Sequence, residues 1–423
     1  MSFRYFAYGS NLLPQQLRSR CLSARSVGTG ILTDWELVCD KPSLDGSLKF
    51  NIRPRSGAEV TGVIYEIDDV DSEALDAAEP LYTRVEVDVN GPALTYTYGG
   101  DAEVGQPYDW YVAMARAGAD LHGITASSFD IDFEEDPLLG GLRPAGTDDL
   151  ASMEAVVRRG LTANNGRYSP HPGELSWWMY HSDPTVHKDT WWLHGNKALL
   201  LIEESRPEIN LFTLPGVDRV PMIEWAQTRR LGGRGEVGWV GDEDEELITY
   251  LTSSGYESVH VDRSFRWDLV EKRVPDPELP DGWVLRHVAG ESEADNRRMA
   301  SHAAFESKME PGQHLQRYLR FMRSPSYQPE RDLVAVAPDG RIGSFMVWWP
   351  DESGIAQIEP FGTHPDFHRQ GIGRALLYHG LSEMSRGGMR TARVITDDYR
   401  AATDFYEGIG FEDVGRVRWW RKS

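Results

Sequence analysis

The sequence predicts a mixed α/β protein of the α+β class that is divided into several domains. Three observations lead to this prediction. The 423 residues are more than a single hydrophobic core usually serves. Strand patterns dominate residues 1–128, and a strand that leads through a glycine turn into a helix stands at residues 355–377. Finally, residues 245–257 resemble residues 400–412, and this separation of 155 residues is the size of a domain.

The first part of the chain alternates predicted strands and helices. Residues 60–67 are a short, mostly apolar strand candidate, and residues 85–89 alternate with the period of two that a half-buried strand shows. Residues 72–78 begin with a serine and carry an acid in the first turn, as helices do. Residues 107–117 are predicted as a second helix, which ends at Gly118 because glycine commonly stops helices.

Two stretches are predicted as linkers. Residues 129–149 combine an acidic run with proline and glycine. Residues 276–282 lie in a stretch whose three prolines exclude a continuous helix or a central strand. The two copies of the internal repeat lie on either side of the second linker. We therefore expect two related α+β domains, one before and one after this linker. We therefore predict domains at residues 1–128, 150–275 and 283–423.

The net charge and the cysteine content of the chain limit which partners and metals we expect it to bind. The chain carries 44 Lys and Arg against 66 Asp and Glu, and the net charge of −22 repels nucleic acid and anionic membranes, so we expect neither as a partner. Cys21 and Cys39 are too few for a structural zinc site or a disulfide framework, and we expect no metal. The first residues lack the apolar core of a signal peptide, so we expect a cytoplasmic protein. The oligomeric state stays open.

A glycine turn follows the first predicted strand. Tyr8, Gly9, Ser10 and Asn11 are residue types that suit a tight turn and a helix cap. Such a turn directs several backbone N–H groups one way, which makes a small cradle for an anion or a carbonyl oxygen. An ordinary strand-to-helix turn explains the same residues.

About 125 residues at the start of the chain resemble the γ-glutamylcyclotransferase/AIG2-like superfamily. The resemblance implies a small β-barrel-like fold with helices. It also implies a reaction in which a γ-glutamyl amide cyclises to 5-oxoproline and releases an amine. The matching segments, in chain order, are residues 8–11, 49–52, 60–67, 75–79, 82–85 and 107–119.

The implied reaction assigns roles to residues. Because the substrate's own α-amine attacks its γ-carbonyl, the enzyme mainly has to fold the glutamyl tail and move protons. The resemblance makes Glu79 the acid/base, and the backbone from Tyr8 to Asn11 the binder of the glutamyl head or of the developing oxyanion. Pro80 departs from the family, which commonly has glycine there, and proline restricts the residue before it. The alternative for Glu79 is a solvated surface acid.

A second glycine turn lies near the end of the chain. Gly371 and Gly373 let the backbone approach a ligand, and the helix that follows offers free N–H groups and a positive dipole. This geometry suits a pyrophosphate, and Arg369 adds charge. A purely structural turn is the alternative.

Residues 283–423 resemble the GNAT superfamily of acyl-CoA-dependent N-acyltransferases. The glycine turn matches motif A, and residues 392–410 match motif B with its FYEGIGF sequence. His368 departs from the usual Gln or Arg, and Tyr399 stands where Asn is frequent. The resemblance implies a central mixed sheet, with acetyl-CoA bound between splayed strands. The residues implied to bind it are Gly362, Thr363, His368, Arg369, Gln370, Gly371, Ile372, Gly373 and Arg374.

The same resemblance indicates catalytic groups. Tyr406 matches the general acid that protonates the leaving thiolate, with a core tyrosine as the alternative. Glu359 is our candidate base, with a structural glutamate or a chain of waters as alternatives. The middle domain is predicted as a degenerate GNAT-type unit without an acyl-CoA site, because Leu251 stands where Tyr406 stands in the last domain.

We therefore predict a bifunctional enzyme for small molecules. Its first domain would cyclise a γ-glutamyl substrate, and its last would transfer an acetyl group from acetyl-CoA to an amine. Two alternatives stay open: an acetyltransferase whose first domain is a non-catalytic binding module, and a regulatory protein that senses acetyl-CoA.

Overall fold

The computed structural model confirms the mixed α/β class and describes residues 1–101, 105–180, 189–203 and 206–422. The chain divides into two compact units, and the segment 150–275 contributes to both. The predicted domain boundaries stay predictions. Unit 1 comprises Met1–Gly146, Pro184–Leu211 and Asp218–Val237, and unit 2 comprises Thr147–Asp183, Phe212–Val217 and Gly238–Ser423.

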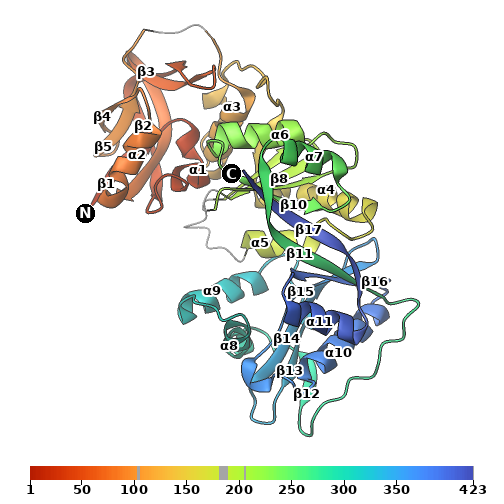
Figure 1. Cartoon of the computed structure of the whole chain (residues 1–423). Coiled ribbons are helices and arrows are strands. Elements are labelled where there is room, and N and C mark those ends of the chain that lie inside the picture. Colours follow the sequence, from red (N-terminus) through yellow and green to blue (C-terminus); the bar gives the residue numbers. More distant parts are fainter. Residues whose placement is uncertain (102–104, 181–188, 204–205, 423) are drawn as a thin grey trace. The chain divides into compact units, whose positions relative to one another are not determined.

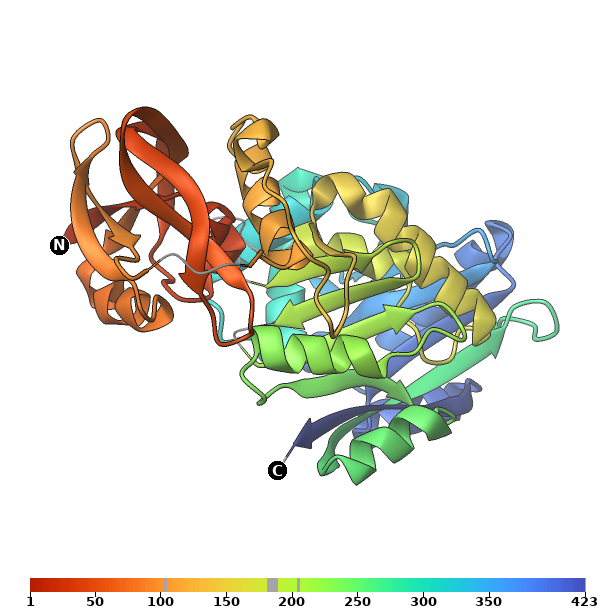
Figure 2. The same cartoon turned by 90° about the horizontal axis from the view of Figure 1, so that it is seen from above.

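Unit 1 is built on a five-stranded sheet with the strand order β2-β3-β1-β5-β4. β1 pairs in parallel with β5, and the other neighbours are antiparallel. β2 and β3 form a long twisted ribbon (Figure 2). Both strands predicted in this region are confirmed, as parts of β3 and β4. The strands are β1 Ser2–Ala7, β2 Arg25–Pro42, β3 Leu48–Asp68, β4 Thr83–Asp88 and β5 Pro92–Thr97.

Short helices and a second group of strands complete unit 1. The predicted helix Ser72–Ala78 is confirmed as α2. The predicted linker 129–149 includes a strand, β6, which pairs with β7. The boundary between the units falls inside β9 and β10. The remaining elements are α1 Pro14–Arg18, α3 Asp109–Leu121, β6 Leu142–Ala145, β7 Thr190–His194, β8 Ala198–Glu203, β9 Glu208–Thr213, α6 Val220–Trp225, the π-helical turn η5 Ala226–Arg230, and β10 Glu236–Gly241.

The predicted end of the second helix is wrong. α3 runs through Gly118 and ends at Leu121. A Cβ atom on Gly118 would lie 2.4 Å from the carbonyl carbon of Leu12 and 2.4 Å from the backbone nitrogen of Leu13. Glycine is therefore needed here for the close approach of helix and turn, and it does not serve as a stop signal.

Unit 2 is an α/β structure whose sheet has the strand order β12-β13-β14-β15-β16-β11-β17 (Figure 1). Its strands are β11 Tyr256–Asp268, β12 Val284–His287, β13 Asp332–Val336, β14 Ile342–Trp349, β15 Ile355–Thr363, β16 Thr391–Asp397 and β17 Glu412–Lys422. Its helices are α4 Leu150–Ala163, α5 Pro172–Tyr180, α7 Glu245–Ser253, α8 Ala294–Ala304, α9 Pro311–Met322, α10 Ile372–Arg386 and α11 Arg400–Ile409.

Helices cover both faces of this sheet. Alternate residues of a strand point to opposite faces, and the core follows this rule. Met346 and Trp348 of β14 pack with side chains of α10 and α11, whereas Phe345 and Val347 pack with side chains of α8 and α9. The layers keep β15 and β16, which carry the predicted GNAT-type site, in the middle of the sheet.

The internal repeat corresponds to two helix–strand units. α7 leads into β11, and α11 leads into β17. β11 and β17 pair with each other as antiparallel neighbours, so the repeated strands lie side by side in one sheet.

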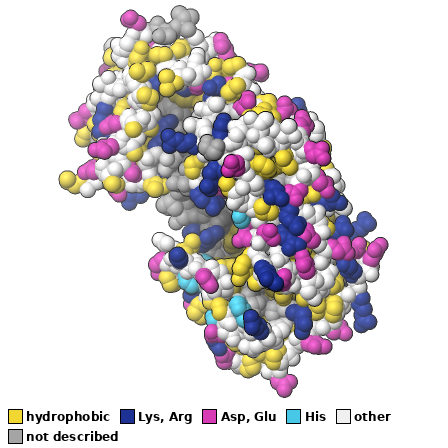
Figure 3. All heavy atoms as spheres, viewed as in Figure 1, with side chains coloured by type: hydrophobic (Ala, Val, Ile, Leu, Met, Phe, Trp, Pro, Cys, Tyr) yellow, Lys and Arg dark blue, Asp and Glu magenta, His cyan; other side chains and the backbone are white. Residues whose placement is uncertain are grey.

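The surface carries charged side chains of both signs. Acidic and basic side chains are intermixed over the face that Figure 3 presents. Among the described helices, none combines the length and the apolarity that a membrane crossing requires.

Replacing Gly118 by alanine is expected to destabilise unit 1. The new methyl group overlaps backbone atoms, which cannot rotate away, so we expect a loss of about 1–3 kcal/mol. Gly99→Ala is the matched control, because a Cβ at Gly99 meets no atom within 4 Å. Thermal unfolding monitored by circular dichroism measures both variants. Equal melting temperatures would contradict the close packing of α3 on the turn at Leu12 and Leu13.

Candidate active sites

The predicted cradle in unit 1 is a 3-10 turn at Ser10–Leu12 that follows β1. The N–H groups of Leu12 and Leu13 close this turn through the carbonyl groups of Gly9 and Ser10, at 2.9 and 3.1 Å. The N–H groups of Ser10 and Asn11 lie outside these bonds. The hydroxyl of Tyr8 is buried and donates to the carbonyl of Tyr96 at 2.5 Å, so it holds the turn in place.

Glu79 lies at the C-terminal end of α2, beside this turn. Its Oε1 atom accepts a hydrogen bond from Asn11 Nδ2 at 2.8 Å and lies 2.9 Å from a guanidinium nitrogen of Arg20. The same guanidinium donates to Asn11 Oδ1 at 3.1 Å, and Asn11 Nδ2 also donates to the hydroxyl of Tyr5 at 2.9 Å. The structure thus brings Glu79, Asn11 and Arg20 together, and the two neighbours fix the position of the Glu79 carboxyl group.

A cavity of about 620 Å³ opens beside Glu79. Ser10 and Pro80 line it, together with residues of the β2–β3 hairpin, α3 and η5. Tyr82 and Tyr111 contribute buried phenol groups, and burial raises the pKa of each phenol above its ordinary value. The Tyr82 hydroxyl donates to the carbonyl of Phe50, whereas the Tyr111 hydroxyl accepts from the backbone N–H of Phe50 at 3.2 Å. Tyr111 therefore keeps its O–H group for a hydrogen bond to a polar ligand.

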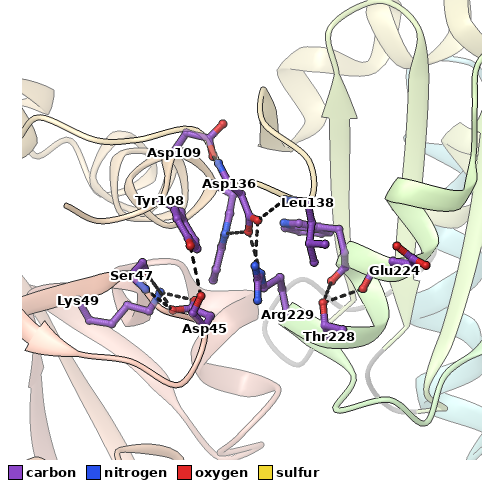
Figure 4. A network of polar contacts seen from close by, with 12 residues as sticks. Asp45, Ser47, Lys49, Tyr108, Asp109, Asp136, Leu138, Glu224, Thr228 and Arg229 are labelled. Carbon is purple, nitrogen blue, oxygen red and sulfur yellow. Dashed lines mark hydrogen bonds and ion pairs between the residues drawn. The ribbon is translucent and has the colours of Figure 1, made fainter. Parts of the chain in front are cut away.

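Arg229, which lines this cavity, forms an ion pair with the buried Asp136 (Figure 4). Arg229 of η5 donates to both carboxylate oxygens of Asp136, at 2.8 and 2.9 Å. Trp110 donates to the same carboxylate at 2.9 Å. The guanidinium also lies 5.5 Å from the ring centroid of Tyr108, whose hydroxyl donates to the carbonyl of Asp45 at 3.3 Å. Through Arg229, η5 contributes to the lining of the cavity beside Glu79.

Lys41 and Lys49 add positive charge to this cavity from the hairpin strands. Lys49 Nζ lies 2.7 Å from a carboxylate oxygen of Asp45. Lys41 is 5% exposed, and its Nζ lies 4.7 Å from the ring centroid of Tyr82. Burial lowers the pKa of both lysines. Sequence reasoning missed these two lysines, although both flank the Asp-Gly turn of the hairpin.

The site in unit 2 begins where β15 leaves β16. The two strands pair in parallel only at residues 355–357 and 391–393. Beyond these pairs β15 stays paired with β14, and β16 stays paired with β11. Glu359 and Pro360 lie just beyond the last pair, so the predicted splay is at this point.

A buried arginine joins the two strands just before they separate. Arg393 of β16 is 1% exposed and donates to the side chain of Gln357 on β15. It also donates to the carbonyl of Gly166 at 2.7 Å. Burial lowers the pKa of Arg393 to about 10, and the nearby carboxylate of Glu174 opposes this shift.

Glu359 lies in acidic surroundings. Burial raises its pKa to about 8, and the carboxylates of Glu174, Asp262 and Asp397 add to the rise. Sequence reasoning missed these three acids, because only the pairing of β11 with β16 places Asp262 opposite Asp397. A carboxyl group with such a pKa exchanges protons near neutral pH.

Glu359 also lines a cavity of about 330 Å³. Its other lining is basic and aromatic, and it includes Arg297, Arg298 and Arg317 as well as Trp177. Arg297 and Arg298 come from α8, Arg317 from α9, and Trp177 from α5. The cavity therefore combines one proton-exchanging carboxyl group with a cationic lining.

Tyr406 of α11 is 5% exposed and lies among the rings of Phe265, Phe361 and Phe411, with centroid distances of 5.6, 6.5 and 5.5 Å. Burial raises its pKa above the ordinary value, and Glu359 contributes to this shift. The raised pKa keeps Tyr406 protonated near neutral pH, as a general acid must be.

The glycine turn opens α10 as the sequence pattern predicts. Gly371 caps the helix with a φ of 80°, in the left-handed region. The N–H groups of Ile372, Gly373 and Arg374 lie in the first turn, where a helix offers them no acceptor. A Cβ on Gly371 would meet only the side chain of Arg374, at 3.8 Å, so the space beside the turn is open.

Two other glycines allow close packing around β15, Gly373 against the strand itself and Gly362 against a side chain of β14. A Cβ on Gly373 would lie 2.6 Å from Thr363 Oγ1, and a Cβ on Gly362 would lie 2.7 Å from a ring carbon of Phe345. The predicted binding residues of β15 and α10 are therefore neighbours in space.

The side chains of the turn are exposed. His368 places Nε2 at 3.0 Å from the carbonyl oxygen of Thr363, and Gln370 donates to another carbonyl of the turn at 3.1 Å. Within the described residues, Arg369 and Arg374 form no ion pair, so their charges are available to an anion. The left-handed Arg369, with a φ of 60°, bends the chain here.

One further cluster has the residue types of a metal site. His260, Asp262 and Asp397 bring their ligand atoms within 4.8 Å of one another. His260 Nε2 already lies 2.8 Å from Asp262, and burial raises the pKa of that carboxyl to about 6. The hydrogen bond between the imidazole and the carboxyl accounts for the arrangement.

Comparison with known proteins matches each end of the chain to a family. The family model for γ-glutamyl cyclotransferase, AIG2-like proteins matches residues 5–112, and the model for the acetyltransferase (GNAT) family matches residues 298–411. A mycothiol acetyltransferase of Salinispora tropica is 30% identical over 146 residues, which are 33% of this chain and 47% of the relative. The chain spans about half the length of the curated relatives it matches.

Two solved structures are similar to parts of the chain. A γ-glutamyl cyclotransferase is 25% identical, covers 32% of this chain and 90% of its own, and has a TM-score of 0.30. A tandem GNAT protein from the clavulanic acid biosynthesis pathway is 15% identical, covers 67% of this chain and 98% of its own, and has a TM-score of 0.49. From the two family matches, the chain carries a γ-glutamyl cyclotransferase, AIG2-like domain in its N-terminal part and a GNAT acetyltransferase domain in its C-terminal part.

Proposed function

We propose that the protein is an enzyme with two active sites for small molecules. The site in unit 1 cyclises a γ-glutamyl amide to 5-oxoproline and releases an amine. The site in unit 2 transfers an acetyl group from acetyl-CoA to an amine. The observation that carries acetyl transfer is the separation of β15 from β16 at Glu359, together with an open helix start at Gly371. The observation that carries cyclisation is the cavity beside Glu79, whose carboxyl group is held by Asn11 and Arg20.

In unit 1, Glu79 moves the protons. Its carboxylate takes a proton from the substrate's α-amine, and that nitrogen attacks the γ-carbonyl carbon. A new C–N bond closes the five-membered ring, and the old amide C–N bond breaks when Glu79 returns the proton to the leaving nitrogen. The N–H groups of Ser10 and Asn11, which take no part in the bonds that close the turn, would bind the carbonyl oxygen as it becomes negative. Asn11 and Arg20 fix the position of the carboxylate.

In unit 2, the turn at residues 368–374 is suited to a pyrophosphate. The first-turn N–H groups, the helix dipole and the exposed side chains of Arg369 and Arg374 all favour an anion. The open space beside Gly371 leaves room for it. These residues would hold acetyl-CoA, which supplies the acetyl group as a thioester.

The two titratable groups at the strand separation act on the acceptor and on the leaving sulfur. Glu359 takes a proton from the acceptor amine, whose nitrogen forms the new amide bond. Tyr406 gives a proton to the sulfur as the C–S bond breaks, and water restores both groups. The curated relatives are named mycothiol acetyltransferases, which supports acetyl transfer in this site.

Glu79→Gln is expected to abolish cyclisation and leave acetyl transfer unchanged. The amide cannot accept the amine proton, so we expect a loss of about 10²–10⁴-fold in 5-oxoproline release from γ-glutamyl amides. The exposed Glu73 of α2 supplies a matched control, Glu73→Gln. Unchanged cyclisation in Glu79→Gln would remove Glu79 from the mechanism. Absence of cyclisation in the wild type, over a broad panel of γ-glutamyl amides, would favour a non-catalytic binding module.

Acetyl transfer is expected to accelerate with rising pH and to level off above about pH 8. Glu359 acts as a base only when ionised, and its raised pKa leaves about a tenth of the molecules ionised at pH 7. Thiol release from acetyl-CoA measures kcat/KM from pH 6 to 9. Glu359→Gln should be slower and should lose the part of the profile that belongs to Glu359. An identical pH profile in the variant would contradict the assignment.

A further inference from the structure

The cavity beside Glu359 has a cationic interior. Three arginines line it, and Glu359 is its one acidic lining residue among those the structure describes. His314 also lines it. Burial, and after it the neighbours His302, Arg298, Arg317 and Arg297, lower the pKa of His314 to about 4. A cavity of this kind stabilises a ligand that carries negative charge.

The three arginines are not equivalent. Arg297 lies 3.1 Å from a carboxylate oxygen of the buried Asp332, and Arg298 lies 2.8 Å from Asp295. Arg317 has no ion pair with any residue that the structure describes. Its guanidinium lies 5.7 Å from the ring centroid of Trp177.

Among the residues that the structure describes, none compensates the charge of Arg317. Its side chain is half-buried, and burial, together with the neighbouring Arg320, lowers its pKa. Removing a charge from water without a counter-ion costs free energy, which an anionic ligand would recover. Arginine binds a carboxylate through two parallel hydrogen bonds, and this fork fixes orientation as well as charge.

The rest of the lining sets the size and the character of the ligand. A volume of about 330 Å³ is near the lower end of small-molecule sites, so the acceptor is small. Trp177, Phe305 and Phe321 supply apolar surface. Glu359 supplies the group that takes a proton from an amine.

We propose that the acceptor of acetyl transfer is a small amine that also carries a carboxylate, such as an apolar or aromatic amino acid, and that Arg317 binds this carboxylate. This inference rests on the proposed acetyl transfer and specifies its substrate class. Arg317 is a specificity-determining residue that acts through the carboxylate of the acceptor, whereas Glu359 acts on the amine.

Matched pairs of acceptors test the inference in the full chain with acetyl-CoA. Leucine, phenylalanine and tyrosine are compared with isoamylamine, phenethylamine and tyramine, which differ from them only by the carboxylate. We expect the amino acid of at least one pair to have a kcat/KM at least about tenfold above its partner, the effect of one charge-assisted hydrogen-bonded pair. The difference should lie in KM.

Variants assign the preference to one residue. Arg317→Met should raise KM for the preferred amino acid about tenfold or more and leave the kinetics of the matching amine within about twofold. Arg317→Lys should restore part of the preference, because it restores the charge without the fork. Arg386→Gln, on an exposed arginine of α10, is the control for a lost positive charge. Thermal unfolding shows whether each variant is folded.

The possible outcomes separate this inference from the proposed function. If no amine in a broad panel is acetylated, the proposed function of unit 2 fails and the inference fails with it. If the amines are acetylated as well as the amino acids, acetyl transfer stands and the inference is wrong. An equal loss on both members of a pair in Arg317→Met also overturns it, since that pattern indicates a structural role.

Discussion

The separation of two parallel strands is the constraint on which the C-terminal site depends. β15 and β16 are hydrogen-bonded neighbours for three residue pairs and then diverge. Arg393 stands at the last pair, fully buried, and it needs acceptors because an unpaired guanidinium inside a protein is costly. The side chain of Gln357 and the carbonyl of Gly166 accept from its Nε and Nη1 atoms, while Nη2 is buried without a hydrogen-bond partner among the described residues. Arg393 thus links β15 and β16 at their last residue pair, and Glu359 lies two residues further along β15, where the strands have separated.

His171, just before α5, also contacts β15 near the place where the strands separate. The ring of His171 lies 3.1 Å from the carbonyl oxygen of Ile355, and its backbone N–H donates to Glu174 at 2.7 Å. Burial lowers the pKa of His171 to about 3, so the ring is neutral and serves as a structural hydrogen-bonding group. Glu174 is then placed to raise the pKa of Glu359. The electrostatics of the base thus depend on residues remote from it in sequence.

The site in unit 1 depends instead on the position of one carboxyl group, that of Glu79, beside a tight turn. Asn11 and Arg20 hold Glu79 from two sides, and both belong to the segment that follows β1. Gly118 lets α3 press against that segment, which fixes the turn from behind. The cavity in front is completed by η5, a piece of chain more than a hundred residues away in sequence.

The sequence predicts well those features that are local. Gly371 and Gly373 before an apolar helix pattern predict the open turn, and alternation at residues 85–89 predicts β4. It does not predict the partners that the topology brings together: Arg20 with Glu79, and Asp262 with Asp397. Gly118 misleads because a glycine at a close approach and a glycine at a helix end look alike in sequence.

The functional residues, too, divide into those that local sequence patterns predict and those that only the folded chain reveals. Glu79, Glu359 and Tyr406 can be proposed from motifs, since each stands at a fixed place in a local pattern. Lys41 and Arg317 cannot, because Lys41 is distinguished by its burial and Arg317 by the lack of a counter-ion among the residues that the structure describes. Such properties arise only from packing, which no short sequence pattern encodes.

A crystal structure of the full chain with CoA tests the central claim most directly. The account predicts that the pyrophosphate oxygens accept hydrogen bonds from the backbone N–H groups at the start of α10, and that the sulfur lies between β15 and β16 near Tyr406. A nucleotide bound elsewhere, or a side chain that fills the space beside Gly371 while CoA is present, would contradict it.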